Sequence, residues 1–128
     1  MNIKIREMNK GDFDDIVQAC ISEGWTTASL RREAFAAALD RSKVIVAYDD
    51  DVFAGYARVI SDSFVTTFLC ELLVAEDYRR KGIGTMLVNF VWELFPETRI
   101  DLISDADGFY EKLNFRRIGT GFRKSRLP

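Results

Sequence analysis

The chain has 128 residues, of which 48% are hydrophobic and ten are Phe, so it can bury a core without disulfides or metal ions. We expect residues 1–128 to form a single domain of ordinary size. The formal net charge of −2 excludes the overall basic field of a nucleic-acid-binding domain, and no apolar run is long enough to span a membrane.

Apolar periodicity in the first half of the chain predicts one strand, two helices and a hairpin. The expected elements are a strand at residues 2–8, helices at 12–22 and 30–39, and strands at 43–48 and 52–60. Gly24 ends the first helix, and Ser29 is the expected N-cap of the second. The polar turn at residues 49–51 joins the last two strands into a hairpin.

The second half of the chain alternates strands with helices. The expected elements are strands at residues 64–74, 99–103 and 115–122 and helices at 86–95 and 105–113. Pro96 ends the first of these helices, because its ring cannot continue a helix. The resulting order, β-α-α-β-β-β-α-β-α-β, predicts an α/β (α+β) fold.

The loop between strand 64–74 and helix 86–95 is the most informative segment. It consists of Arg79, Arg80, Lys81, Gly82, Ile83, Gly84 and Thr85. Its two glycines let the backbone turn sharply and remove side chains that would block a ligand. The helix that follows points unpaired N–H groups and the positive end of its dipole toward the loop. The segment therefore predicts an anion site of the kind that binds pyrophosphate.

Two other phosphate-binding motifs do not fit this loop. A P-loop ends in Gly-Lys-Ser or Gly-Lys-Thr, whereas here Lys81 precedes Gly82. A dinucleotide-binding fingerprint needs Gly or Ala where Leu87 stands. A glycine-kinked turn with solvated basic residues is the alternative that needs no ligand.

Two segments together resemble the GNAT superfamily of N-acetyltransferases. The family signature is Arg or Gln, two residues, Gly, one residue, and Gly or Ala, and it is matched by Arg79, Gly82 and Gly84. Residues 109–115, FYEKLNF, resemble the family's Tyr-Glu-Lys-x-Gly-Phe segment. The order of elements is also similar, so the resemblance covers essentially the whole chain. It implies a central mixed, mostly antiparallel sheet of six to seven strands flanked by about four helices.

The chain departs from the family pattern at two positions. Asn114 replaces the usual Gly of the second segment, and Asn tolerates the same left-handed backbone at a helix end. Ile103 stands where many members carry an Asn, so a cofactor contact through that Asn is not implied.

The resemblance implies that a primary amine of a small molecule or peptide directly attacks the acetyl group of acetyl-CoA. Acetyl-CoA would bind along Leu72, Leu73 and Val74 of the strand and through residues 79–85 of the loop, and no metal is implied. A backbone N–H near Val74 would stabilise the oxyanion. The alternatives are a non-catalytic acyl-CoA-binding or sensing module and a nucleotide phosphate-binding module.

Tyr110 and Glu71 are the expected catalytic residues. A phenol with a pKa near 10 is protonated at neutral pH, so Tyr110 could protonate the leaving thiolate, whose pKa is roughly 8.5; the alternative is packing on the sheet. Glu71 is a carboxylate within an apolar strand, and it is either the base for the amine or part of a structural ion pair. Asp101 or a water relay could replace it as the base, and Asp62 is expected to cap a turn.

The loop between the first two helices is expected to border the acceptor pocket. It contributes Trp25, Thr26 and Thr27, and Glu71 would also contact the acceptor. Tyr56, Phe64 and Phe122 are further candidates, with ordinary core packing as the alternative for the two Phe. The acidic net charge and the carboxylates of the cleft suggest a cationic amine as the acceptor. A polyamine, an aminoglycoside, an amino acid and a protein N-terminus or lysine all fit this expectation.

The chain has two Cys and no His, which excludes Ser-His-Asp and Cys-His catalysis. Cys20 and Cys70 share no metal or redox spacing, and we expect reduced core residues of a cytoplasmic protein. Strand alternation places Cys70 and Glu71 on opposite faces, which disfavours an acetyl-cysteine route. We expect no nucleic-acid or membrane partner, and either a monomer or a homodimer.

Overall fold

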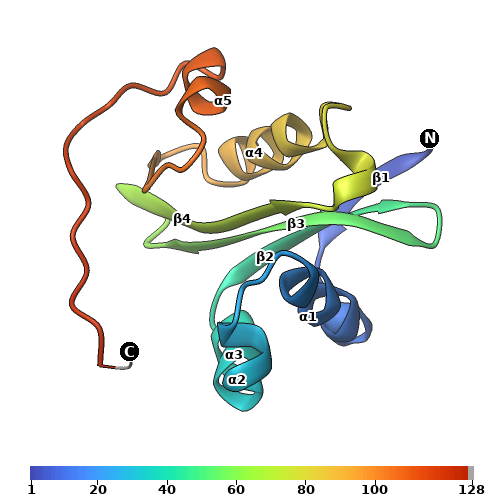
Figure 1. The fold of residues 1–128 in the computed structure, drawn as a ribbon. Helices are drawn as coiled ribbons and strands as arrows, with labels where there is room; N and C mark the ends of the chain where they lie inside the picture. The colour runs from blue at the N-terminus through green and yellow to red at the C-terminus, as the bar shows by residue number, and fades with distance from the viewer. Residues whose placement is uncertain (127–128) are drawn as a thin grey trace.

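A computed structural model describes residues 1–126 and shows one twisted sheet between two layers of helices (Figure 1). The strands of this described part are β1 (Ile3–Glu7), β2 (Lys43–Asp49), β3 (Val52–Ser61), β4 (Thr66–Val74) and β5 (Arg99–Leu102). The α-helices are α1 (Phe13–Ser22), α2 (Thr27–Leu30), α3 (Arg32–Asp40), α4 (Ile83–Leu94) and α5 (Asp107–Lys112). Short 3-10 helices precede α1 (η1, Lys10–Asp12) and follow β4 (η2, Glu76–Tyr78).

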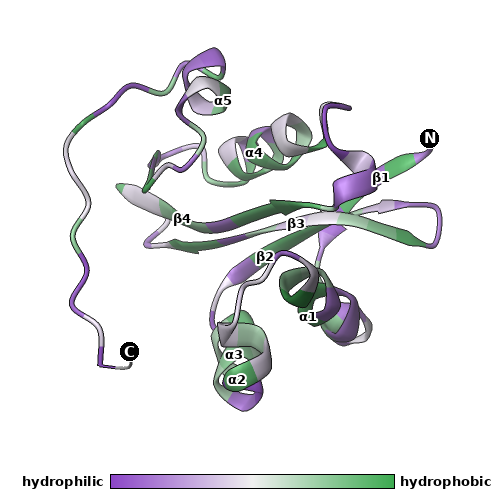
Figure 2. Cartoon of the chain, in the orientation of Figure 1, coloured by the Kyte–Doolittle hydropathy of each residue, from purple (hydrophilic) through white to green (hydrophobic). Residues whose placement is uncertain are grey.

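The strands lie in chain order, β1-β2-β3-β4-β5, and every neighbouring pair is antiparallel except β4 and β5. The parallel pair is joined by α4, which packs on the opposite face of the sheet from α1, α2 and α3 (Figure 1). Figure 2 shows hydrophobic residues concentrated in the strands, and the hairpin tips are hydrophilic.

Strand alternation divides the buried residues into two cores. In β2, Val44 and Val46 join the core under α1 and α3, whereas Ile45 and Ala47 join the core under α4. Each face of the central strands is therefore apolar, as is usual for a sheet that is covered by helices on both sides.

A β-bulge interrupts the pairing of β3 with β4. Arg58 lies opposite Glu71 and Val59 lies opposite Leu69, so Cys70 is an extra residue in β4. A bulge bends its strand and increases the local twist. Beyond this point β4 diverges from β5, because β5 pairs with Thr66–Leu69 only. The end of β4 therefore has a strand on one side and an open edge on the other.

The expected α/β fold is confirmed, and most of its elements lie within a few residues of their predicted positions. Helix α4 begins at Ile83 rather than at residue 86, because Gly82 takes a left-handed conformation (φ 83°) and starts the helix early. The N-cap prediction for Ser29 is wrong. Ser29 lies inside α2, its hydroxyl donates to the carbonyl of Thr26, and Arg31 separates α2 from α3.

The predicted strand at residues 115–122 is also wrong, so the described sheet has five strands instead of six to seven. The large apolar residues of this segment are Phe115, Ile118 and Phe122. Phe115 would lie on the opposite face of a strand from the other two, so no continuous apolar face forms. Two glycines further weaken any pairing. Residues after α5 instead run in an extended path around the edge of the sheet, toward the side that carries α2 and α3 (Figure 1).

Gly55 in β3 permits close approach to the diverging end of β4. A Cβ at this position would lie 2.5 Å from the carbonyl oxygen of Leu73. We expect Gly55→Ala to lower the free energy of unfolding by about 1–3 kcal/mol, measured by urea denaturation. Gly108→Ala is the matched control, because a Cβ there meets no atom within 4 Å and should leave stability unchanged or slightly higher. Equal stability of the two variants would show that β3 and β4 have room to separate.

Candidate functional site

The start of α4 presents a row of backbone N–H donors. The first helical bond runs from the N–H of Met86 to the carbonyl of Gly82 (3.0 Å), and no side chain caps the helix. Within residues 1–126, the N–H groups of residues 80–85 have no hydrogen-bond acceptor. Arg80 and Gly82 both have left-handed φ values, 61° and 83°. Together with the helix dipole, these donors form a concave site suited to an anion.

The three basic residues of the loop have different surroundings. The Nε of Arg79 donates to the carbonyl of Val74 (3.1 Å), and its guanidinium pairs with Glu23 at the end of α1. Arg79 therefore ties the loop to β4 and α1. Lys81 lies over the ring of Tyr78, and neither Arg80 nor Lys81 forms an ion pair in the described chain.

The two sequence motifs touch at Gly84. A Cβ on Gly84 would lie 3.1 Å from the ring of Phe109 in α5. The second glycine is thus needed for close packing of α4 against α5, in addition to any approach of a ligand. This contact explains why the RRKGIG and FYEKLNF segments occur together.

The backbone of Val74 faces the opening between β4 and β5. The N–H of Ala75 donates to the carbonyl of Ala54 (2.9 Å), so these opposed residues are a hydrogen-bonded pair. Antiparallel pairs alternate, which makes Gly55 and Val74 a non-hydrogen-bonded pair whose amide groups point away from each other. The Arg79 bond to the Val74 carbonyl agrees with this orientation. By the same alternation Leu72 faces the opening, whereas Leu73 pairs with β3.

Tyr110 lies beside this opening on α5. Its half-buried ring packs edge-on against Phe109 and Phe115, at centroid distances of 5.0 and 5.5 Å. Burial, with a smaller effect of the Asp105 charge, raises the pKa of Tyr110 to about 12. Its hydroxyl has no hydrogen-bond partner among the described residues.

The end of α5 is closed as the Asn114 prediction requires. Asn114 has φ 68°, its N–H donates to Glu111, and the N–H of Phe115 donates to Tyr110. These two bonds form a Schellman motif, which fixes the C-terminus of the helix.

Glu71 takes part in a structural ion pair. One carboxylate oxygen accepts from the hydroxyl of Tyr56 (2.8 Å), and the other accepts from Nε and Nη2 of Arg58 (3.0 and 2.6 Å). The Tyr56 hydroxyl is also 3.3 Å from Sγ of Cys20. Burial, followed by the Glu71 charge, raises the pKa of Tyr56 above its usual range, so it remains a neutral donor.

A pocket of about 220 Å³ opens beside this network, and we call it the Glu71 pocket. It is lined by Cys20, Trp25, Thr27, Ala28, Phe35, Tyr56, Cys70, Glu71 and Arg123. The prediction that Cys70 and Glu71 face opposite sides is wrong, because the bulge at Cys70 breaks the alternation. Burial raises the pKa of the Cys70 thiol, so the thiolate is disfavoured.

The other predicted residues lie elsewhere. Thr26 is outside the pocket lining and caps α2 through its carbonyl. Phe64 and Phe122 are 78% and 91% exposed and line neither pocket. Asp62 accepts from three backbone N–H groups of its turn, as expected for a turn cap. Asp101 pairs with Arg99 in β5.

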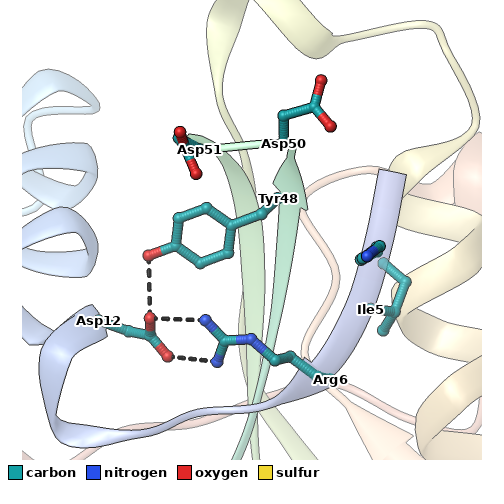
Figure 3. Close-up of a pocket in the computed structure, with 7 residues that line it drawn as sticks. Ile5, Arg6, Asp12, Tyr48, Asp50 and Asp51 are labelled. Carbon is teal, nitrogen blue, oxygen red and sulfur yellow. Dashed lines mark hydrogen bonds and ion pairs between the residues drawn. The ribbon is translucent and has the colours of Figure 1, made fainter. Parts of the chain in front are cut away.

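A larger, open pocket of about 480 Å³ lies at β1 and the β2–β3 hairpin (Figure 3). Arg6 binds both carboxylate oxygens of Asp12, and the hydroxyl of Tyr48 donates to the same carboxylate (Figure 3). The hydrogen-bonding groups of Arg6, Asp12 and Tyr48 are therefore paired with one another. The pocket is lined from β1, η1 and the hairpin, without any residue of the loop, β4 or α5.

The sequence model of the Acetyltransferase (GNAT) domain matches residues 40–117. The chain belongs to the GNAT acetyltransferase family. The matched part of this GNAT chain includes the loop at residues 79–85, the diverging end of β4, and Tyr110.

Solved structures share the fold over nearly the whole length. A GNAT-family acetyltransferase from Streptococcus pneumoniae TIGR4 is 26% identical with a TM-score of 0.83, covering 98% of this chain and 99% of that one. The PaiA N-acetyltransferase of Thermoplasma acidophilum, solved in complex with coenzyme A, is 16% identical with a TM-score of 0.69, covering 89% and 88%. That second likeness concerns the fold alone.

Among curated proteins, an uncharacterized N-acetyltransferase, ycf52, of Pyropia yezoensis is 23% identical over 111 residues. The match covers 79% of the GNAT chain and 63% of the relative's length. Within residues 1–126, no helix has the length and apolar character needed to cross a membrane, and no group of three or more metal-ligating side chains occurs.

Five residues of the site were not predicted from the sequence: Cys20, Ala28, Phe35 and Arg123 of the pocket lining, and Arg58, which pairs with Glu71. Arg58 had a usable signal, because a lone cation in strand 52–60 can pair with the lone Glu71 of the neighbouring strand. Cys20 resembles any core residue of a helix. Arg123 could not be placed, because it follows residues 115–122, which were expected to form a strand.

Proposed function

We propose that residues 1–128 act as one N-acetyltransferase domain that transfers the acetyl group of acetyl-CoA to a primary amine. One observation carries the proposal: an open strand edge, with the Val74 N–H facing it, leads directly to unpaired N–H donors at the start of α4. These donors fit a pyrophosphate, and the edge of β4 fits an extended amide-bearing arm.

Acetyl-CoA would lie along the opening between β4 and β5. Its pyrophosphate would accept from the N–H groups of residues 80–85, with Arg80 and Lys81 adding positive charge. Its pantetheine amides would pair with the backbone of Leu72 and Val74, because Leu73 already pairs with β3. Acetyl-CoA supplies the activated thioester for the reaction.

The chain supplies an oxyanion donor and an acid. The Val74 N–H would stabilise the charge that develops on the acetyl oxygen. The amine nitrogen forms the new C–N bond and loses a proton, while the C–S bond breaks and the sulfur accepts a proton from Tyr110. Because burial disfavours the Cys70 thiolate, direct attack by the amine is preferred over an acetyl-cysteine route.

Two carboxylates, Glu71 and Asp101, are candidates to accept the proton that the amine releases. Glu71 lines the pocket, but both of its oxygens already accept hydrogen bonds from Tyr56 or Arg58. Because both oxygens are engaged in this way, we favour a water relay beside Glu71 over direct proton transfer to its carboxylate. Asp101 is paired with Arg99 and is the less suitable candidate.

Coenzyme A binding tests the loop. We expect Arg80→Ala to weaken CoA binding about three- to tenfold in calorimetry, because one cation at the pyrophosphate is lost. Arg41→Ala, at an exposed residue beyond α3, is the matched control and should bind normally. ATP binding as tight as CoA binding would support a nucleotide phosphate-binding module instead.

Removing the hydroxyl of Tyr110 tests the catalytic role. We expect Tyr110→Phe to lower kcat about 100-fold or more, with CoA affinity within twofold of wild type, because only proton transfer is lost. Thiol release measures turnover and calorimetry measures affinity. Unchanged turnover would refute the general acid, and absence of turnover in the wild-type protein with every amine would favour a non-catalytic acyl-CoA-binding module.

The pH dependence of kcat follows from the raised pKa of Tyr110. The acid must be protonated, and a pKa raised to about 12 keeps it protonated throughout the accessible range. We therefore expect kcat to rise or stay level from pH 6.5 to 10, with no descending limb. A descending limb with a midpoint between pH 8 and 9 would assign the acid to another group.

A further inference from the structure

The C-terminal segment contributes one residue, Arg123, to the lining of the Glu71 pocket. After α5 this segment runs around the edge of the sheet toward α2 and α3 (Figure 1). Gly121 packs against Ile103, where a Cβ would lie 3.2 Å away, and Arg123 then reaches the pocket lined by Glu71. A cation from outside the sheet is thereby added to the pocket.

The charges of the pocket do not cancel. Glu71 is already neutralised by Arg58, which approaches the same carboxylate oxygen with Nε and Nη2 at 3.0 and 2.6 Å. Arg123 forms no ion pair or hydrogen bond within residues 1–126. The uncompensated charge at the pocket is therefore positive, contrary to the cationic acceptor that the net acidity of the chain suggests.

Other polar groups of the lining also lack partners. The indole N–H of Trp25 and the hydroxyl of Thr27 make no hydrogen bond to the described chain. Together with the five N–H groups of the Arg123 guanidinium, they make the pocket rich in donors. A donor-rich rim with one unpaired guanidinium is complementary to a carboxylate.

The inner part of the pocket is apolar and small. Phe35, Ala28 and Cys20 are 5%, 1% and 1% exposed and line it, and its volume is about 220 Å³. This space accommodates a short aliphatic or aromatic side chain, and a long polyamine or an aminoglycoside would not be enclosed.

We propose that the acceptor is a small amino acid-like molecule, which carries an amine, a carboxylate and an apolar side chain, and that Arg123 binds the carboxylate. The proposal rests on the proposed function, because it names the substrate class of the same site. The amine is directed to the Glu71 side of the pocket, next to the end of β4, and the apolar side chain lies near Phe35. Arg123 is a specificity residue and takes no part in proton transfer.

Three amines with the same apolar side chain test the carboxylate preference: L-leucine, its isosteric amide L-leucinamide, and 3-methylbutylamine, which lacks the carboxyl group. With wild-type protein and acetyl-CoA, we expect kcat/KM for leucine to exceed that for leucinamide about tenfold. Arg123→Gln should raise KM for leucine about five- to tenfold with little change in kcat, and should leave leucinamide within twofold. Lys124→Gln, the neighbouring cation, is the matched control and should behave as wild type.

Two outcomes of this assay overturn the proposal. One is an amide or a simple amine that is acetylated as well as leucine by the wild-type protein. The other is an equal loss for leucine and leucinamide in Arg123→Gln, which would indicate a structural role. In both cases acetyl transfer is retained, so the proposed function stands while the substrate class fails.

A binding measurement separates the two proposals when no amine is acetylated. The chain has two Trp, so Trp92→Phe leaves Trp25 as the sole reporter in the pocket. Titration with N-acetyl-L-leucine should change the Trp25 fluorescence until the site is saturated. Arg123→Gln in the Trp92→Phe background should weaken this binding about fivefold or more. Lys124→Gln in the same background should leave the binding unchanged. Arg123-dependent binding without turnover would refute the acetyltransferase and keep the carboxylate site. No Arg123-dependent signal would refute the site.

Discussion

The divergence of β4 from β5 is the constraint on which the rest of the site depends. The pairing of β4 with β5 stops after Leu69, and the extra residue Cys70 bends β4 at that point. The end of β4 beyond the bulge remains paired with β3 on one side, and its other edge is open. Had β5 continued to pair, the N–H and carbonyl groups of Val74 would be used in the sheet, and no ligand could reach them.

The bulge also places side chains that regular alternation would separate. Cys70 and Glu71 both line the Glu71 pocket, and the Glu71 carboxylate is held between Tyr56 and Arg58. A half-buried carboxylate without such partners would be costly, so this network fixes the floor of the pocket in one arrangement. Because Arg58 neutralises Glu71, the proposed role of Arg123 in choosing the acceptor depends on its unpaired positive charge.

The glycine loop acts as a joint between three parts of the fold. Arg79 connects it to the end of β4 and, through Glu23, to α1, while Gly84 lets α4 contact Phe109 of α5. The anion-binding donors, the open strand edge and the Tyr110 helix are therefore held in fixed relation. These contacts give a physical reason why the two motifs occur together, although they are 25 or more residues apart in sequence.

The sequence by itself determined the element types, the glycine loop at a helix start, and the family, because these depend on local periodicity and on short motifs. It also predicted the left-handed Asn114 and the Asp62 turn, which depend on neighbouring residues alone. The bulge at Cys70, the pairing of Glu71 with Arg58, and the course of the chain after α5 were decided by tertiary structure. Each depends on contacts between residues distant in sequence, since a bulge is defined only against a partner strand and a pocket wall only against the surface it approaches.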